Sequence, residues 1–179
     1  MNGVLRLGVA AVAATLLTWV GIGIYRAGGD VPSPPNMPQT TLTAGHAEGR
    51  RLDGRPSWSL DYDHLIASAD TTIATLENVR HGELYKRGKP YMEMVAKHVV
   101  VNTLSNDFVV TGPLELIEND GAHNRRLTSD AANYSGVLET LTLTRPAKIR
   151  SDGVTVDVKT VTVDFRSGDM TLGPLVGLY

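Results

Sequence analysis

An uncharged stretch near the N-terminus restricts what this chain can fold into. Residues 7–25, LGVAAVAATLLTWVGIGIY, carry no charged side chain, and Arg26 follows at once. A helix rises about 1.5 Å per residue, so this stretch spans roughly 28 Å, close to the hydrocarbon thickness of a bilayer. Because lipid offers the backbone no hydrogen-bond partners, a lone apolar span has to be helical. We therefore predict a single N-terminal transmembrane anchor over residues 1–27.

A cleaved signal peptide is the alternative for this stretch. Such peptides have a shorter apolar core, of about 7–15 residues, and small residues at the cleavage site. Here bulky Tyr25 stands where a small residue is needed for cleavage after Ala27, which favours the uncleaved anchor. The N-terminal amine and Arg6 precede the span, and only Arg26 follows it closely. The positive-inside rule then predicts a single-pass protein of the inner (cytoplasmic) membrane with its C-terminal domain in the periplasm.

Composition excludes several classes of function. The formal net charge is −2, there is no cysteine, and there are five histidines. This mild acidity argues against nucleic-acid binding, which requires a basic face. Without cysteine there are no disulfides, thiol nucleophiles or Cys-ligated zinc, and the sequence has no HExxH, GxSxG or Walker motif. We predict a protein that is not an enzyme, with no catalytic residues, no metal site and no cofactor.

The segment after the anchor reads as a linker. Pro32, Pro34, Pro35 and Pro38 fall close together among glycine and polar residues. Proline fixes φ and favours extended polyproline conformation. We predict a linker over residues 28–56 and a single domain over residues 57–179.

From residue 57 onward, apolar residues recur at every second position. Valine or phenylalanine alternates with polar residues in 154–158 and 161–166, and leucine alternates with threonine in 140–144. This period is typical of strands with one buried and one wet face. Short helical turns stay open as alternatives only at 64–69 and 128–133. The sequence therefore predicts a mainly β fold.

Turn dipeptides recur at a nearly constant interval. Glycines at 54, 88, 121 and 153 are spaced by 34, 33 and 32 residues, and each follows Asp or Arg. Glycine accepts positive φ, so such dipeptides favour hairpins. The spacing indicates repeated hairpin units in a stacked or rolled antiparallel sheet, with chance recurrence as the alternative.

Several segments resemble the LptC-type lipopolysaccharide export proteins, relatives of the OstA/LptA β-jellyroll family. The similarity covers most of residues 57–173: SWSLDYDHL, LENVRHGELYKRGKPYMEMVAKHVVVNTLSNDFVVTGPLEL, LTSDAANYSGVLETLTL and PAKIRSDGVTV. Layout carries the resemblance more than any one motif does: one membrane span, a linker and a β domain with an early Trp58.

The resemblance implies a fold and a function. Such proteins fold as an open, twisted antiparallel β-jellyroll anchored in the inner membrane. They work with the permeases of an ABC transporter, take the acyl chains of lipopolysaccharide into the apolar inside of the roll, and pass this glycolipid to a periplasmic bridge protein by strand addition. The family has no catalytic residues.

The alternating pattern also gives candidates for the inward, lipid-facing side. Burial is worth about 25 cal/mol per Å², whether a second sheet or an acyl chain covers the surface. Plain core packing is the competing interpretation for each residue, and a register error of one would reverse the face. The candidates are Val99, Val101, Phe108, Val110, Leu114, Leu116, Leu141, Leu143, Ile149, Val156 and Val163.

Two further hypotheses follow from the sequence. The C-terminal strands, around residues 161–172, are expected to offer a free edge to the next module. The main functional alternative is a membrane-tethered β domain that scaffolds an envelope complex without moving lipid. A closed and fully packed interior would favour this scaffold.

Overall fold

The fold is described here from a computed structural model covering residues 40–118, 125–144 and 146–178. The predicted anchor and the start of the predicted linker lie outside these residues. All regular elements within them are strands, and they contain no helix with the length and hydropathy of a membrane span. The mainly β fold predicted from the alternation is confirmed. Residues 64–69 and 128–133, the alternative helical turns, lie largely within strands.

Twelve strands form one antiparallel sheet in the described part of the chain. They are β1 (Thr40–Arg50), β2 (Pro56–Ala67), β3 (Ile73–Lys86), β4 (Lys89–Asn102), β5 (Asp107–Glu118), β6 (Arg126–Ser135), β7 (Thr140–Leu143), β8 (Ala147–Ser151), β9 (Val154–Val158), β10 (Val161–Asp164), β11 (Met170–Leu172) and β12 (Leu175–Leu178).

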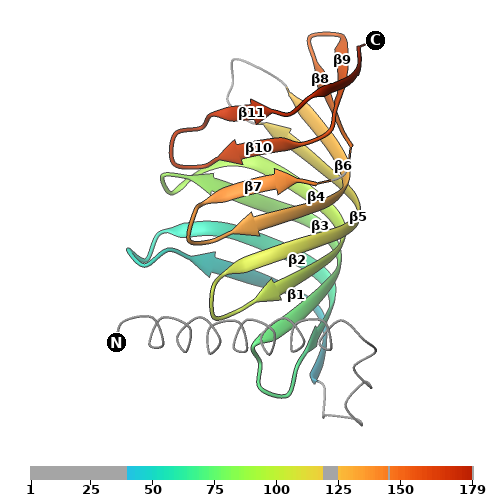
Figure 1. The fold of residues 1–179 in the computed structure, drawn as a ribbon. Coiled ribbons are helices and arrows are strands. Elements are labelled where there is room, and N and C mark those ends of the chain that lie inside the picture. The colour runs from blue at the N-terminus through green and yellow to red at the C-terminus, as the bar shows by residue number, and fades with distance from the viewer. Residues whose placement is uncertain (1–39, 119–124, 145, 179) are drawn as a thin grey trace, which may run out of the picture. The chain divides into compact units, whose positions relative to one another are not determined.

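The strands are neighbours in chain order from β1 to β7, and the sheet forks at β6. β6 pairs with β8 through its first residues and with β7 through its last ones. One branch continues through β7, β10 and β11, and the other through β8, β9 and β12. Figure 1 shows the strands twisting and curving strongly from the β1 end to the C-terminal strands. Among the described strands, β1, β11 and β12 each have one side without a strand partner.

The last four strands make one long bent hairpin. β10 pairs with β11 and β9 pairs with β12, and backbone hydrogen bonds from Gly173 and Lys159 bridge the bend between them. The free edge expected around residues 161–172 therefore needs correction. β10 has partners on both sides, so of the expected range only β11 lies at the edge, which continues along β12.

The hairpin turns predicted from glycine dipeptides are confirmed where the structure describes them. Arg87 and Gly88 have φ of 55° and 77°, and Asp152 and Gly153 have φ of 49° and 82°. Two successive positive φ values are the mark of a type I′ turn, whose twist matches that of the flanking strands.

The predicted boundary at residue 57 is wrong, because β1 lies inside the predicted linker. Pro38–Tyr179 cluster as one compact unit. The inner face of β1 is formed by Gly45, Ala47 and Gly49, so it lacks the large alternating residues that announce a strand. The missing side chains leave room for aromatic rings: a Cβ on Gly45 would lie 2.5 Å from the Tyr62 hydroxyl, and one on Gly49 would lie 2.2 Å from the Trp58 ring.

Candidate lipid-binding interior

The residues predicted to face inward lie together in one core. Ten of the eleven are at most 7% exposed, and Val156 is partly buried and packs against the same cluster. Cross-strand rows explain this arrangement, since directly paired residues of antiparallel strands share a face. One row reads Val99, Val110, Ala132, Leu143 and Val161 across β4, β5, β6, β7 and β10.

A chain of aromatic rings crosses the interior and joins residues of strands that are not all neighbours. Trp58 of β2 meets Phe108 of β5 edge-on at 5.9 Å, and Phe108 stacks on Tyr134 at 4.8 Å. Tyr134 contacts Phe165 at 6.0 Å, and Phe165 meets Tyr91 at 5.9 Å. Such pairs add about 0.5–1.5 kcal/mol each beyond their buried area. The curled sheet thus fills its central interior with its own side chains.

The Trp58 end of this interior is open. A pocket of about 290 Å³ lies there between the inner faces of β1 to β4. Its apolar walls come from Ala47, Leu65, Ala74, Leu76 and Val101, beside the Trp58 ring. Val101 is the predicted inward residue that reaches this opening; the others in the core lie deeper or further along the sheet.

Sequence reasoning missed most of this pocket. Ala47 lies in the segment predicted as a linker, and Leu65 lies where β2 loses strict alternation through a bulge between Asp61 and His64. Leu65 pairs with Leu76 and thereby returns to the inner face. Trp58 is noted only through the family resemblance, although a tryptophan near a strand start is a usable signal for a core position.

A larger hollow, of about 670 Å³, lies on the opposite face of the sheet. Its floor includes the outward row Val100, Val109, Asn133 and Thr142, which alternates with the buried row. This face mixes apolar and polar side chains and is open to solvent, so we place the candidate site at the inner opening instead.

Buried polar groups sit at two places along the aromatic chain. The Tyr134 hydroxyl lies near Ser57 but makes no full hydrogen bond among the described residues, and burial raises its pKa above the usual value of 10.0. The Glu118 side chain is buried, accepts a hydrogen bond from the Tyr91 hydroxyl at 2.7 Å, and pairs with Arg125 at 2.7 Å. No group of three or more His, Asp or Glu side chains that could hold a metal ion occurs in the described part of the chain.

Comparisons with known proteins bear on the function of this interior. One similar solved structure is the crystal structure of LptH, the LptA-homologous periplasmic component of the lipopolysaccharide transport device of Pseudomonas aeruginosa; the match has 11% identity and a TM-score of 0.42, and covers 82% of this chain and 89% of that one. The curated proteins give no match. The model of the LptC-related lipopolysaccharide-assembly family matches residues 55–172, more than half of the sequence. The chain therefore belongs to the LptC-related lipopolysaccharide-assembly family, whose members are non-enzymatic proteins of lipopolysaccharide transport.

Proposed function

We propose that this protein is a membrane-anchored carrier in lipopolysaccharide export. It accepts the glycolipid from the permeases of an inner-membrane ABC transporter and relays it to a periplasmic bridge protein that has a similar β-jellyroll fold. Residues 1–27 tether it to the inner membrane, and the β domain works in the periplasm.

The observation that carries the proposal is the apolar pocket at the Trp58 end of the roll. Its lining combines the partly exposed Leu65 and Ala74 with the buried Leu76 and Val101, at the mouth of a core that continues through the sheet. Apolar area removed from water is worth about 25 cal/mol per Å², so an acyl chain gains by covering these side chains. Further entry of the chain requires core side chains, first of all Trp58, to move aside.

Relay by strand addition is supported by the free edge of the C-terminal hairpin. β11 and β12 have no partner on one side among the described strands, and residues 170–178 contain no charge. Leu172, Leu175 and Val176 are exposed along this edge. Natural proteins protect such edges with charges or with short strands; β11 and β12 are three and four residues long but carry no charge, and this apolar edge suits a docking strand.

The scaffold function is the second candidate, and a specific observation favours it. Phe108, Tyr134 and Phe165 are at most 3% exposed, so side chains already occupy the middle of the interior. A protein that only holds a complex together would need no more than this packed core and its free edges.

Photo-crosslinking in cells separates the carrier from the scaffold. A photoreactive amino acid replaces Leu65, which lines the pocket, or its neighbour Ile66, which points to the other face of β2. Adducts with lipopolysaccharide at Leu65 and not at Ile66 are expected for the carrier. A folded, normally expressed protein without adducts at Leu65 or Ala74 would establish the scaffold instead.

A further inference from the structure

A third hollow lies beside the apolar pocket and is built from three hairpin turns. The β1–β2, β4–β5 and β6–β7 turns enclose about 420 Å³, and the β10–β11 turn adds Arg166. Figure 1 shows the β1–β2, β6–β7 and β10–β11 turns on the same side of the sheet. We refer to this hollow as the arginine pocket, after Arg50, Arg51 and Arg166 in its lining.

The three arginines differ in burial and in their contacts. The Arg51 side chain is 13% exposed, donates to the Tyr85 carbonyl at 3.2 Å, and keeps a buried Nε without a hydrogen-bond partner among the described residues. The Arg50 and Arg166 side chains are 60% and 57% exposed. Arg50 and Arg166 are therefore reachable from solvent, with Arg50 pairing with Glu48 at 3.0 Å and donating to the Gly54 carbonyl at 2.9 Å, while Arg51 is largely buried.

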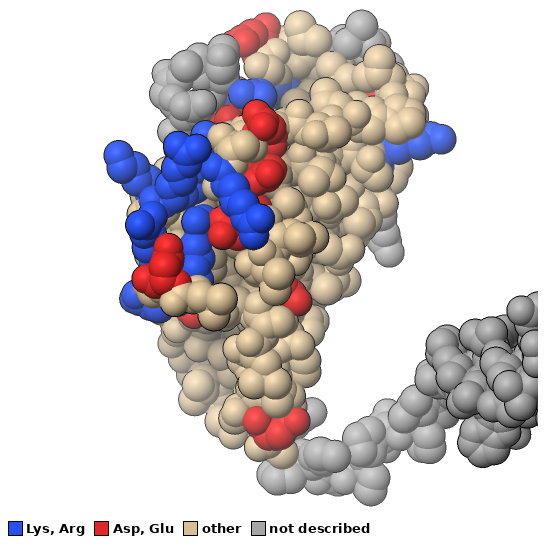
Figure 2. All heavy atoms as spheres, turned by 60° about the vertical axis from the view of Figure 1, so that its left-hand side comes forward, with Lys and Arg blue, Asp and Glu red and all other residues tan. Residues whose placement is uncertain are grey.

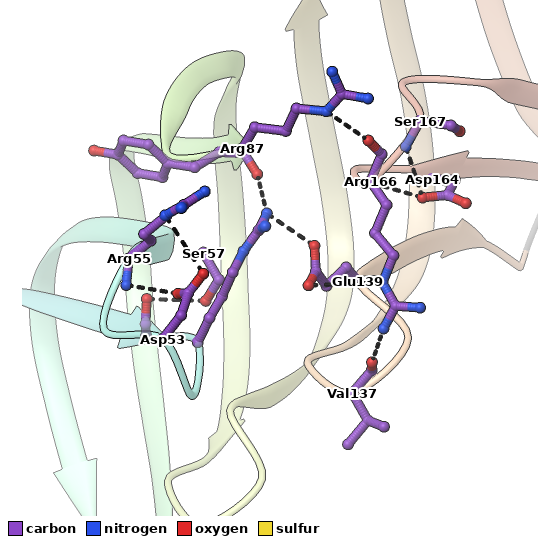
Figure 3. Close-up of polar contacts among 12 residues, drawn as sticks. Asp53, Arg55, Ser57, Arg87, Val137, Glu139, Asp164, Arg166 and Ser167 are labelled. Atoms are coloured by element: carbon purple, nitrogen blue, oxygen red, sulfur yellow. Dashed lines mark hydrogen bonds and ion pairs between the residues drawn. The ribbon is translucent and has the colours of Figure 1, made fainter.

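One carboxylate holds this arrangement together. Glu139 pairs with Arg51 at 2.9 Å and lies 3.7 Å from Arg166, and its own side chain is only 14% exposed. Figure 3 shows the Arg166 side chain running past Glu139 to the Val137 carbonyl, to which it donates. Glu139 thus occupies the position that an external anion would take between the two arginines.

The pocket keeps an excess of positive charge. Its lining holds three arginines against Asp53 and Glu139; with the adjoining pairs of Arg55 to Asp53 at 3.4 Å and of Glu48 to Arg50 at 3.0 Å, four arginines face three carboxylates. Figure 2 shows Lys and Arg side chains gathered on the side of the molecule that carries these turns, with acidic groups among and beside them. Guanidinium groups bind phosphate strongly because their planar donors match its oxygens.

Exposed apolar side chains surround the same arginines. Leu52, Leu104 and Val137, one on each of the three turns, are 111%, 79% and 71% exposed. Large apolar residues at hairpin tips beside a basic pocket match an amphiphilic ligand rather than a free ion.

The arginine pocket and the apolar pocket share a wall. Asn106 lines both, donates from its side chain to the Arg50 carbonyl at 3.1 Å, and accepts from the Trp58 indole at 3.1 Å. A ligand with a charged group joined to an alkyl chain can therefore place one part in each pocket.

We propose that the arginine pocket binds a phosphate group of the glycolipid while an acyl chain lies in the adjoining apolar pocket. This inference rests on the proposed carrier function and deepens it by assigning the headgroup end of the site. Arg50 and Arg166 contact the phosphate, and Glu48 and Glu139, which pair with these arginines, compete with it when the site is empty.

The test uses the full chain in phosphatidylcholine nanodiscs, with a photoreactive amino acid at Leu65. Crosslinking is titrated with purified lipopolysaccharide and with the same preparation after enzymatic removal of its phosphates. The variants are R50Q/R166Q, E139Q and, as a matched control, R126Q, whose exposed side chain pairs with Glu115 on another part of the sheet.

We expect R50Q/R166Q to raise the half-saturating concentration of phosphorylated glycolipid about three- to tenfold, the range of one or two exposed charge-assisted contacts. E139Q lowers it, because glutamine keeps a hydrogen-bond acceptor for Arg51 but removes the competing charge. Neither change affects the dephosphorylated form, and R126Q matches the parent.

The outcomes that would contradict the phosphate site differ from those that would contradict the carrier function. If both glycolipid forms crosslink and the arginine variants bind them as the parent does, the phosphate site is refuted and the carrier function stands. If neither form crosslinks, the carrier function itself fails. If inorganic phosphate at the concentration of the glycolipid suppresses crosslinking, the pocket is a site for the free ion, and the headgroup assignment is overturned.

Discussion

Small residues decide where the large ones can lie on the inner face. Trp58 and Tyr62 cover backbone positions where β1 has Gly49 and Gly45, and no Cβ would fit there. The ring of Trp58 then reaches both the Asn106 carbonyl and the Phe108 ring, at one wall of the open pocket. A glycine thereby sets the position of the aromatic residue at the mouth of the candidate site.

Tyr134 gives a prediction at this scale, through the pH dependence of stability. Burial raises the pKa of its hydroxyl, so the folded state favours the protonated form. That contribution is complete below the unfolded-state value near 10 and is lost as the pH rises toward the folded-state pKa. We expect Y134F to be close to neutral at pH 7 and to reduce the loss of stability above about pH 10. Urea unfolding of both proteins at pH 8 to 11 measures this, and equal alkaline slopes would contradict it.

At the scale of elements, the free edges at the two ends of the sheet differ in charge and in exposed apolar side chains. The β1 edge carries His46, Glu48 and Arg50 and a positive φ of 48° at Ala44, which disturbs the strand. The β11–β12 edge is uncharged and carries exposed leucine and valine. Charges and irregular backbone disfavour pairing with another strand, so the C-terminal edge is the better template.

A lysine on the C-terminal edge should weaken docking of the bridge protein. Val176 lies on β12, whereas Val154 lies on β9, which has strand partners on both sides. We expect V176K to reduce co-purification of the bridge protein from solubilised membranes about tenfold, an effect of about 1.4 kcal/mol. V154K, at a similarly exposed valine, is the control. Equal losses for both variants would show that surface charge matters and the edge does not.

At the scale of the whole molecule, side chains hold the curled sheet closed where no backbone ladder does. The β3–β4 turn reaches the β10–β11 turn through Arg87, whose Nε donates to the Arg166 carbonyl at 3.2 Å. Tyr91 donates to the Gly168 carbonyl at 3.2 Å, and Arg51 pairs with Glu139. The Arg87 contact is exposed, whereas Tyr91, Arg51 and Glu139 are largely buried.

Phe108 joins Trp58 to the rest of the aromatic chain and tests whether the interior is one core. It is 1% exposed, and its ring contacts both Trp58 and Tyr134. We expect F108A to lower the free energy of unfolding by about 3–5 kcal/mol, the range for large-to-small changes at aromatic core sites. V109A, at the next residue on the outer face, should cost less than about 1 kcal/mol. Denaturant unfolding of the full chain in mild detergent compares them, and similar costs would mean that the rings do not form a shared core.

The sequence by itself determined alternating strands from residue 57 onward, hairpins at glycine dipeptides and candidates for the buried face. Val99, Val110 and Leu143 alternate with polar or half-exposed neighbours, and that period alone fixes which side of a strand avoids water. Only the tertiary structure decided that Gly45, Ala47 and Gly49 form a strand. The rings of Trp58 and Tyr62, on the next strand, cover the glycines of this strand. The tertiary structure alone brought Arg50, Arg51, Glu139 and Arg166 together, since the curl of the sheet joins turns that lie far apart in the chain. Local periodicity records burial, whereas contacts between distant turns depend on twist and bulges that no local pattern reports.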